Sequence, residues 1–434
     1  MGFEREHWNS NVGFILASVG SAVGIGNVWR FPYLVGTNGG GAFLFPYVVI
    51  LTTFGLALMV LELAVGRYYQ TSIIGCLTRI KKRFKWAGVF TVIVTFVVTS
   101  YYLVILGWIL SYVFIMIFEP TLGFDSFSIS FYPVAAFFAV VGINYLIIRK
   151  GISGGIEKIN KVGVILLVCI LVPLTVYAVF LPGSETGIMF YLWPDFEKIF
   201  EPPIWAAAFG QAFFSLSIGF GTLVAYGSYL RSKGSLVRAS SAIVAFDTII
   251  AFIAGLMIFS FLFSFGMEPD QGASLVFKVM PSIFSQIEFG AVIAVLFFAL
   301  LFIAGITSSV SLFQVPISAM EDNVGMRRGR AVLVVTGLVT LIGIFSALSY
   351  SPIKLAVGGM PVFDFMDTMF GTYGITISAI IFVTIVSWFM DKRSLLEHIQ
   401  QGSRIKIPYM LIYFARFVLP TAIAVTIILS IIKL

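Results

Sequence analysis

The sequence predicts an all-α membrane protein with eleven transmembrane helices. Hydrophobic residues make up 59% of the 434 residues, charged residues make up only 11%, and the mean hydropathy is +1.03. A water-soluble domain of this composition would expose large apolar patches and aggregate. Spanning helices place such side chains in lipid, so the composition favours a multi-pass protein of the cell inner (plasma) membrane, with the lipid bilayer as its surroundings.

Eleven apolar segments are long enough, or nearly long enough, to cross a bilayer, which takes about 20 helical residues. Polar and glycine- or proline-containing stretches separate them and predict the connections. The segments cover residues 10–37, 41–70, 86–118, 131–148, 161–180, 203–230, 237–265, 288–320, 330–348, 361–390 and 408–433.

Basic residues in the connections predict the orientation. Twenty Lys and Arg residues fall on the side of the N-terminus and four on the opposite side. Because cytoplasmic loops are enriched in Lys and Arg, we expect a cytoplasmic N-terminus. The net charge of +7 belongs to these short loops, so it predicts no nucleic-acid partner.

The first segment contains a polar, glycine-rich stretch at mid-membrane. Three glycines lie between residues 20 and 26, followed by Asn27 and Arg30. Glycine weakens a helix, and polar groups are costly at this depth, so we expect a break. Free carbonyls before the break suit a cation, and amides after it suit a carboxylate. A close-packing face of small residues is the alternative interpretation of the glycines.

The sixth segment carries a second glycine interruption, within residues 213–222. Two glycine-broken spans at matching positions indicate an inverted repeat with a binding site at the breaks. We therefore expect a single transmembrane domain over residues 1–434. Within it, residues 10–180 and 203–390 form two inverted repeats of five helices each, with broken first and sixth helices, and residues 408–433 form an additional eleventh helix.

Several polar residues lie deep in the predicted spans. A carboxylate at Asp247 needs a cation or a proton, although a protonated structural acid is the alternative. For Glu62 we favour a structural role, in which its side chain braces the broken sixth helix. The hydroxyls of Thr307 and Ser308 often bond the carbonyl one turn back in such helices.

Seven motifs, in this order and spacing, resemble the neurotransmitter:sodium symporters over nearly the whole chain. The resemblance is to their bacterial amino-acid transporters with the leucine-transporter fold. The motifs are Arg5-Glu6-His7-Trp8, residues 24–32 (GIGNVWRFP), residues 38–43 (NGGGAF), Glu62 with Gly66-Arg67, residues 210–221 (GQAFFSLSIGFG), residues 304–309 (AGITSS) and Glu321-Asp322.

The resemblance implies two sodium ions as the ionic partners. The first site would use the carbonyl of Ala22, the side chains of Asn27, Ser215 and Asp247, and the carboxylate of the substrate. The second site would use the carbonyls of Gly20, Val23 and Ala304 and the hydroxyls of Thr307 and Ser308.

The resemblance also implies where substrate and gates lie. The substrate would lie on Ala22, Ile25 and Gly26, with Tyr102 bonding its carboxylate, and Ser215 would also belong to its site. The pocket for its side chain would be lined by Val98, Phe214, Ser217, Phe220, Ser308 and Leu312. The outer gate would be Arg30 with Asp367, helped by Gln211, Phe214 and Tyr102. The inner gate would be Arg5 with Asp322, braced by Trp8 and Tyr229.

Two departures from the pattern that the resemblance implies, and one special feature, bear on the expected function. Eleven spans are expected, where the family usually has twelve. Asp247 stands where asparagine is commoner, and Ala251 stands where chloride-independent relatives carry a carboxylate, so Asp247 is expected to make transport independent of chloride. Gly163 and Pro173, ten residues apart, resemble a motif that lets the fifth helix unwind toward the second sodium site; an ordinary kinked span is the alternative.

The expected function is therefore not enzymatic. It is sodium-coupled symport of a neutral, hydrophobic L-amino acid by alternating access, because the implied side-chain pocket is apolar. A proton-coupled transporter of the same fold is the nearest alternative. A non-transporting amino-acid sensor or a channel is a more distant one. The sequence leaves the oligomeric state open.

Overall fold

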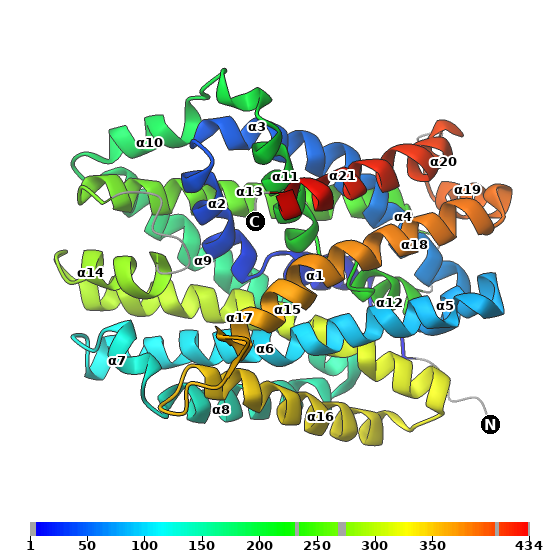
Figure 1. Ribbon diagram of the computed structural model, residues 1–434, viewed down its shortest axis with the longest axis horizontal. Helices are drawn as coiled ribbons and strands as arrows, with labels where there is room; N and C mark the ends of the chain where they lie inside the picture. The colour runs from blue at the N-terminus through cyan, green and yellow to red at the C-terminus, as the bar shows by residue number, and fades with distance from the viewer. Residues whose placement is uncertain (1–5, 231–233, 268–274, 404–407, 433–434) are drawn as a thin grey trace.

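The computed structural model describes residues 6–230, 234–267, 275–403 and 408–432. Long helices run along one common axis, among them α6, α15 and α16 (Figure 1). Shorter helices gather at the two ends of the bundle, α7, α10 and α14 at one end and α5 and α19 at the end that carries the N-terminus.

Helices dominate the first half of the chain; η denotes π-helical or 3-10 segments. The elements are α1 (Asn11–Ala22), η1 (Gly26–Arg30), α2 (Phe31–Thr37), α3 (Gly41–Ile50), η2 (Leu51–Gly55), α4 (Leu56–Tyr69), α5 (Ile73–Ile80), η3 (Lys82–Phe84), α6 (Lys85–Phe118), α7 (Phe124–Ser128), α8 (Tyr132–Ile148), η4 (Ile152–Glu157), α9 (Lys158–Val179) and α10 (Ser184–Leu192).

The second half adds one short antiparallel hairpin. The elements are η5 (Lys198–Phe200), α11 (Pro202–Ser215), α12 (Thr222–Ser228), α13 (Leu236–Ser264), η6 (Leu275–Val279), α14 (Met280–Phe284), α15 (Gly290–Val324), α16 (Arg328–Ser349), β1 (Ala356–Val357), β2 (Met360–Pro361), α17 (Val362–Met366), η7 (Asp367–Gly374), α18 (Ile375–Phe389), α19 (Lys392–Gln400), α20 (Met410–Tyr413), η8 (Phe414–Val418) and α21 (Leu419–Ile432).

The predicted fold class, an all-α membrane protein with broken first and sixth helices, is confirmed. Among the described residues, eight helices are long and apolar enough to span a membrane, and the bent pair 11–22 and 26–37 makes nine. The shorter apolar helix α8 and the interrupted pair α11 and α12 bring the total to a number consistent with the eleven expected spans.

The first break lies where the glycines predict it. The helix α1 ends at Ala22, and the extended backbone of Val23 (φ −74°, ψ 93°) turns the chain before η1 begins at Gly26. The two helical halves are bent by 47° relative to each other. The peptide groups of residues 20–26 therefore lie partly outside helical hydrogen bonding at the middle of the bundle.

The second break, between α11 and α12, contains three residues with left-handed backbone: Ser217, Gly219 and Gly221 have φ of 55°, 84° and 75°. Such angles are natural for glycine but uncommon for serine. Glu62 of α4 accepts a hydrogen bond from the amide of Gly219 at 2.8 Å. This is the bracing contact that the sequence predicts for Glu62.

The fifth span shows no unwinding in this structure. The helix α9 is continuous through Gly163 and Pro173, and π-helix η4 precedes it. Both residues of the expected unwinding motif, Gly163 and Pro173, therefore lie within a regular α-helix in this structure.

The short helix α19 docks on the end of α4 through Arg67 and His398. Arg67 Nε donates to Nε2 of the His398 ring at 3.0 Å, and its Nη2 donates to the His398 carbonyl at 2.7 Å. Burial, together with the adjacent guanidinium, lowers the pKa of His398 from 6.5 to about 4. The ring is therefore held in its neutral form, with Nε2 as acceptor.

We expect this contact to make stability depend on pH between about 6.5 and 4. In that window the unfolded chain binds a proton at His398 and the folded protein does not, so stability falls as the pH falls. Thermal unfolding in detergent at pH 7 and pH 5 should show a larger loss for the wild type than for His398→Gln. Equal losses in the two proteins would contradict this assignment.

Candidate functional site: two stacked cavities at the helix breaks

A small cavity of about 30 Å³ lies between the two breaks. Both breaks, α6 and α15 contribute to its wall. The lining residues are Ser21, Ala22, Gly24, Gly26, Val98, Tyr102, Phe214, Ser215, Ser217, Phe220, Ser308 and Leu312. Every residue of the predicted substrate set lines this cavity except Ile25, which lines the larger cavity next to it.

Glycines make the close approach at this cavity possible. A Cβ at Gly24 would lie 2.6 Å from Ser308 Oγ and 3.4 Å from the Tyr102 hydroxyl. A Cβ at Gly26 would lie 2.9 Å from the Phe214 ring. Any side chain at these two positions would therefore fill the cavity or displace its walls.

On one side of the cavity, three fully buried side chains form a hydrogen-bonded cluster around Asp247 of α13. Asn27 Nδ2 donates to Asp247 Oδ1 at 2.7 Å and to Ser215 Oγ at 3.1 Å. The Ser215 hydroxyl lies 2.9 Å from both carboxylate oxygens. Ala22, whose carbonyl belongs to the predicted first sodium site, lines the adjoining cavity.

A second oxygen cluster lies between α1 and α15. Ser308 Oγ lies 3.3 Å from the carbonyl oxygens of Gly20 and Ala304. Thr307 Oγ1 donates to the Ala304 carbonyl at 2.9 Å and to the Ile303 carbonyl at 3.1 Å. The structure thus brings together the hydroxyls and two of the three carbonyls of the predicted second sodium site, and Val23 follows directly after the end of α1.

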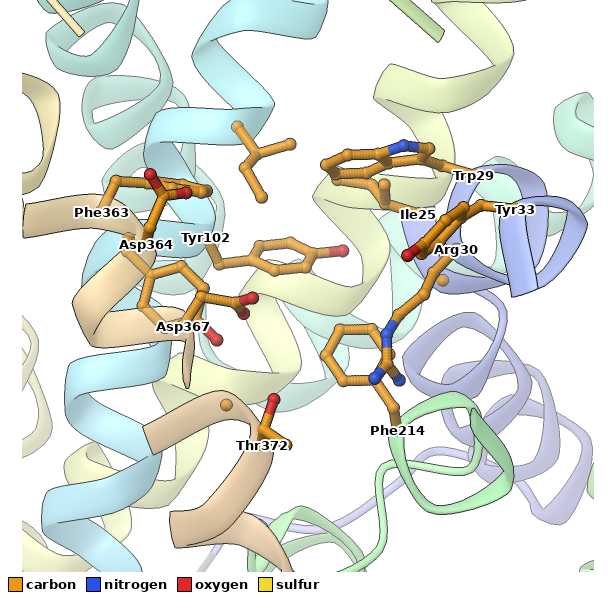
Figure 2. A pocket seen from close by; sticks show the side chains of 14 residues that line it. Ile25, Trp29, Arg30, Tyr33, Tyr102, Phe214, Phe363, Asp364, Asp367 and Thr372 are labelled. Atoms are coloured by element: carbon orange, nitrogen blue, oxygen red, sulfur yellow. The ribbon is translucent and has the colours of Figure 1, made fainter. Parts of the chain in front are cut away.

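A larger cavity of about 190 Å³ lies beyond the small one, farther from the N-terminal end of α1. Figure 2 shows Arg30 and Asp367 on its opposite walls, with the Tyr102 hydroxyl between them. Gly26, Tyr102 and Phe214 line both cavities, so the two cavities adjoin each other at the breaks.

The comparisons with known proteins identify the family. The model of the sodium:neurotransmitter symporter family matches residues 5–133 and 126–434. An uncharacterized sodium-dependent transporter of Methanocaldococcus jannaschii is 37% identical, over 98% of this chain and 90% of its own length. The chain belongs to the sodium:neurotransmitter symporter family.

Two further relatives extend the comparison. A sodium- and chloride-dependent GABA transporter of Mus musculus is 29% identical, over 99% of this chain and 80% of its own length. The crystal structure of MhsT in complex with L-phenylalanine matches with a TM-score of 0.88 and 33% identity, over 98% of this chain and 99% of that chain. The protein is therefore a sodium-dependent membrane transporter and not an enzyme.

The predicted outer-gate pair of the symporter is apart in this structure. Among the described residues, no ion pair joins Arg30 and Asp367. Instead Arg30 Nη1 lies 3.4 Å from Gln211 Oε1, and its guanidinium carbon lies 4.9 Å from the centre of the Phe214 ring. Gln211 also donates to the Gly26 carbonyl at 3.0 Å. The larger cavity separates the two charges, as expected if this side is open.

The predicted inner gate can be described only in part, because Arg5 lies outside the described residues. Asp322 accepts a hydrogen bond from the amide of Ser72 at the start of α5. Trp8 contacts both tyrosines at the end of α12. Its backbone amide donates to the Tyr229 carbonyl at 3.4 Å, its indole donates to the Tyr226 carbonyl at 3.0 Å, and the centres of the Trp8 and Tyr226 rings are 5.0 Å apart.

The side chain of Tyr229, the other predicted brace, also reaches α15. Its hydroxyl accepts a hydrogen bond from Gln314 at 2.6 Å, and Gln314 in turn accepts one from Arg328 at 3.2 Å. The hydroxyl of Tyr226 reaches α15 as well, where it is hydrogen-bonded to the hydroxyl of Ser311.

Sequence reasoning missed several residues of the larger cavity. They are Trp29, Tyr33, Tyr101, Ile105, Phe363, Gly371 and Thr372. A helical period was the available signal for two of them, because Ile25, Trp29 and Tyr33 are four residues apart and share one helix face. The remainder lie on α6 and on the segment 363–372, whose approach depends on tertiary packing.

Ser217 is a further test of the geometry at the breaks. Its left-handed backbone disfavours β-branched side chains, and its hydroxyl donates to the Ser21 carbonyl at 3.0 Å, tying one break to the other. We expect Ser217→Val to destabilise the symporter by about 2 kcal/mol through backbone strain and the lost hydrogen bond. Ser217→Gly, which relieves the strain, should cost less. Thermal unfolding that gives the two variants equal stability would argue against this geometry.

Proposed function

We propose that this symporter imports a neutral, hydrophobic L-amino acid together with two sodium ions, by alternating access to the small cavity. The observation that carries the proposal is the position of this cavity. Ser215 of the cluster around Asp247, Ser308 of the oxygen cluster between α1 and α15, and an apolar wall all line it. Its apolar wall consists of Val98, Phe214, Phe220 and Leu312.

The first sodium ion would lie beside Asp247. Its oxygen ligands would be the Asp247 carboxylate, the side-chain oxygens of Asn27 and Ser215, the Ala22 carbonyl and the carboxylate of the amino acid. Hard oxygen ligands suit an alkali cation. In the ion's presence, the hydroxyl of Ser215 would turn its hydrogen away from the carboxylate and offer an oxygen. Because ion and substrate would share a contact, each would raise the affinity of the other.

The second ion would bridge α1 and α15. Its oxygen ligands would be the carbonyls of Gly20, Val23 and Ala304 and the hydroxyls of Thr307 and Ser308. An ion bound here would hold the two helices together and favour the conformation in which the larger cavity is open.

The amino acid would lie with its carboxylate toward the start of η1 and the Tyr102 hydroxyl, and its side chain toward the apolar wall. The backbone of Ala22, Ile25 and Gly26 would line its polar end. An L-phenylalanine complex of MhsT, which matches this chain over 98% of its length, supports an amino-acid substrate. Arg30 and Asp367 would approach each other over the loaded site and exclude water.

The sodium gradient would drive accumulation of the amino acid. Moving one charge across 100 mV yields about 2.3 kcal/mol, and a tenfold concentration ratio adds about 1.4 kcal/mol. Two ions would then supply roughly 7 kcal/mol under these assumed gradients. Consistent with the excess of basic residues on the N-terminal side, we propose that this side is cytoplasmic.

Uptake into proteoliposomes tests the proposal. With sodium outside and potassium inside, we expect accumulation of radiolabelled L-leucine or L-phenylalanine, and counterflow of the same label with sodium on both sides. A scan of all twenty amino acids should show preference for hydrophobic side chains. Uptake that a proton gradient drives equally well in potassium would refute sodium coupling, and binding without uptake would indicate a sensor.

Gly24→Ala should strongly reduce this uptake, because the added Cβ would lie 2.6 Å from Ser308 Oγ inside the small cavity. We expect a loss of at least tenfold in the initial rate, with the purified variant still monodisperse. Gly142→Ala is the matched control, since a Cβ there meets nothing within 4 Å. A Gly24→Ala variant that transports as fast as the control would place the substrate elsewhere.

Transport should not require chloride. The Asp247 carboxylate would supply the fixed negative charge beside the first sodium ion, and the buried Ala251 one turn along adds none. Replacing chloride by gluconate should leave wild-type uptake unchanged, whereas Asp247→Asn should be inactive in gluconate and partly restored by chloride. Wild-type uptake that stops in gluconate would overturn this assignment.

A further inference from the structure

The buried amide of Asn160 is a polar group that the proposed sites do not use. Asn160 lies on α9 with no exposed surface. Its Nδ2 donates to the Ile156 carbonyl one turn back at 2.8 Å, but its Oδ1 has no hydrogen-bond partner. A buried carbonyl-type oxygen without a partner is costly, so its retention calls for a reason.

The Oδ1 atom of Asn160 faces α1 at Gly20. A Cβ at Gly20 would overlap this oxygen, so the absence of a side chain is what allows the approach. The Gly20 carbonyl lies 3.3 Å from Ser308 Oγ. The unpartnered oxygen therefore lies against the residue whose carbonyl we place in the second sodium site.

The next turn of α9 touches the other wall of that site. A Cβ at Gly163 would lie 2.6 Å from Cγ2 of Thr307 on α15. Asn160 and Gly163 are three residues apart and share one helix face. One face of α9 thus lies against both Gly20 and Thr307, two residues of the proposed second sodium site.

Just before the start of α9, the last residue of η4 places a carboxylate beside the N-terminal segment. Glu157 precedes Asn160 by three residues and is only 7% exposed. One of its carboxylate oxygens accepts a hydrogen bond from the amide of Asn9 at 3.0 Å, and the other faces Gly13 of α1. Oxygen donors therefore follow one another from the N-terminal end of the bundle to the second site.

We propose that Asn160 Oδ1, together with Glu157, forms a transient sodium site that receives the ion as it leaves the second site toward the cytoplasm. The inference rests on the proposed second sodium site. When α1 separates from α9, the amide oxygen replaces ligands that the ion loses from Gly20 and Ser308. A neutral amide followed by a single, already hydrogen-bonded carboxylate binds a partly hydrated monovalent cation weakly, so the ion passes on.

Substitution of Asn160 separates sodium release from sodium binding. Two readouts are compared on purified protein and in proteoliposomes: the sodium concentration that gives half-maximal binding of L-leucine, and the rate of ²²Na⁺ entry coupled to L-leucine uptake. For Asn160→Ala we expect the half-maximal sodium concentration to stay within twofold of wild type, and the coupled rate of ²²Na⁺ entry to fall at least tenfold. Asn160→Leu, similar in size to asparagine, should behave alike, and Asn160→Asp should keep at least a third of the wild-type rate.

Asn144→Ala is the matched control for packing. Asn144 is equally buried, but both of its polar atoms are paired, Nδ2 with the Val140 carbonyl at 3.0 Å and Oδ1 with Ser309 at 2.8 Å. Its coupled sodium rate should stay within threefold of wild type. Wild-type rates in the Asn160 variants, equal slowing in Asn144→Ala, or slowing that accompanies an equal loss of sodium binding would overturn the inference. Absence of sodium-dependent binding in the wild type would instead defeat the proposed function.

Discussion

The structure depends on how two interrupted helices satisfy their peptide groups in the middle of a bilayer. Lipid offers no hydrogen bonds, so irregular backbone is tolerated there only where protein surrounds it. Side chains from neighbouring helices meet this requirement. Glu62 accepts from the Gly219 amide, Ser217 donates to the Ser21 carbonyl, and Thr95 donates to the Phe220 carbonyl at 2.6 Å. These contacts hold both breaks open as structured segments instead of allowing them to wind into continuous helix.

The same constraint explains why the site is rich in oxygen. Where α1 ends, the carbonyls of Gly20 and Ser21, which a continuous helix would occupy with its own amides, accept hydrogen bonds from Ser308 instead. Carbonyl, hydroxyl and carboxylate oxygens at such a place favour a cation, which supports the assignment of two sodium sites. Family membership is consistent with this, because the relatives are sodium-dependent transporters. In the proposed mechanism, the apolar wall of the small cavity then selects the side chain of the co-transported substrate.

Much of this could be predicted from the sequence, since glycine spacing, apolar length and deep polar residues are local signals. They located both breaks, and the resemblance to the family supplied the residues around the small cavity. Features set by tertiary packing could not be predicted. Nothing local requires Ser217 to adopt a left-handed backbone, places Tyr101 in the larger cavity, or turns Trp8 toward Tyr226. The separation of Arg30 from Asp367 belongs to one conformation of the protein, and a single sequence encodes all of its conformations.

The central claim is that an ion and an amino acid share a contact at the broken helices. Isothermal titration calorimetry of the purified protein tests it most directly, by measuring L-leucine affinity over a range of sodium concentrations and sodium affinity over a range of L-leucine concentrations. The account predicts that each ligand tightens the other by the same factor, as linkage requires. Equal L-leucine affinity in sodium and in potassium would contradict it.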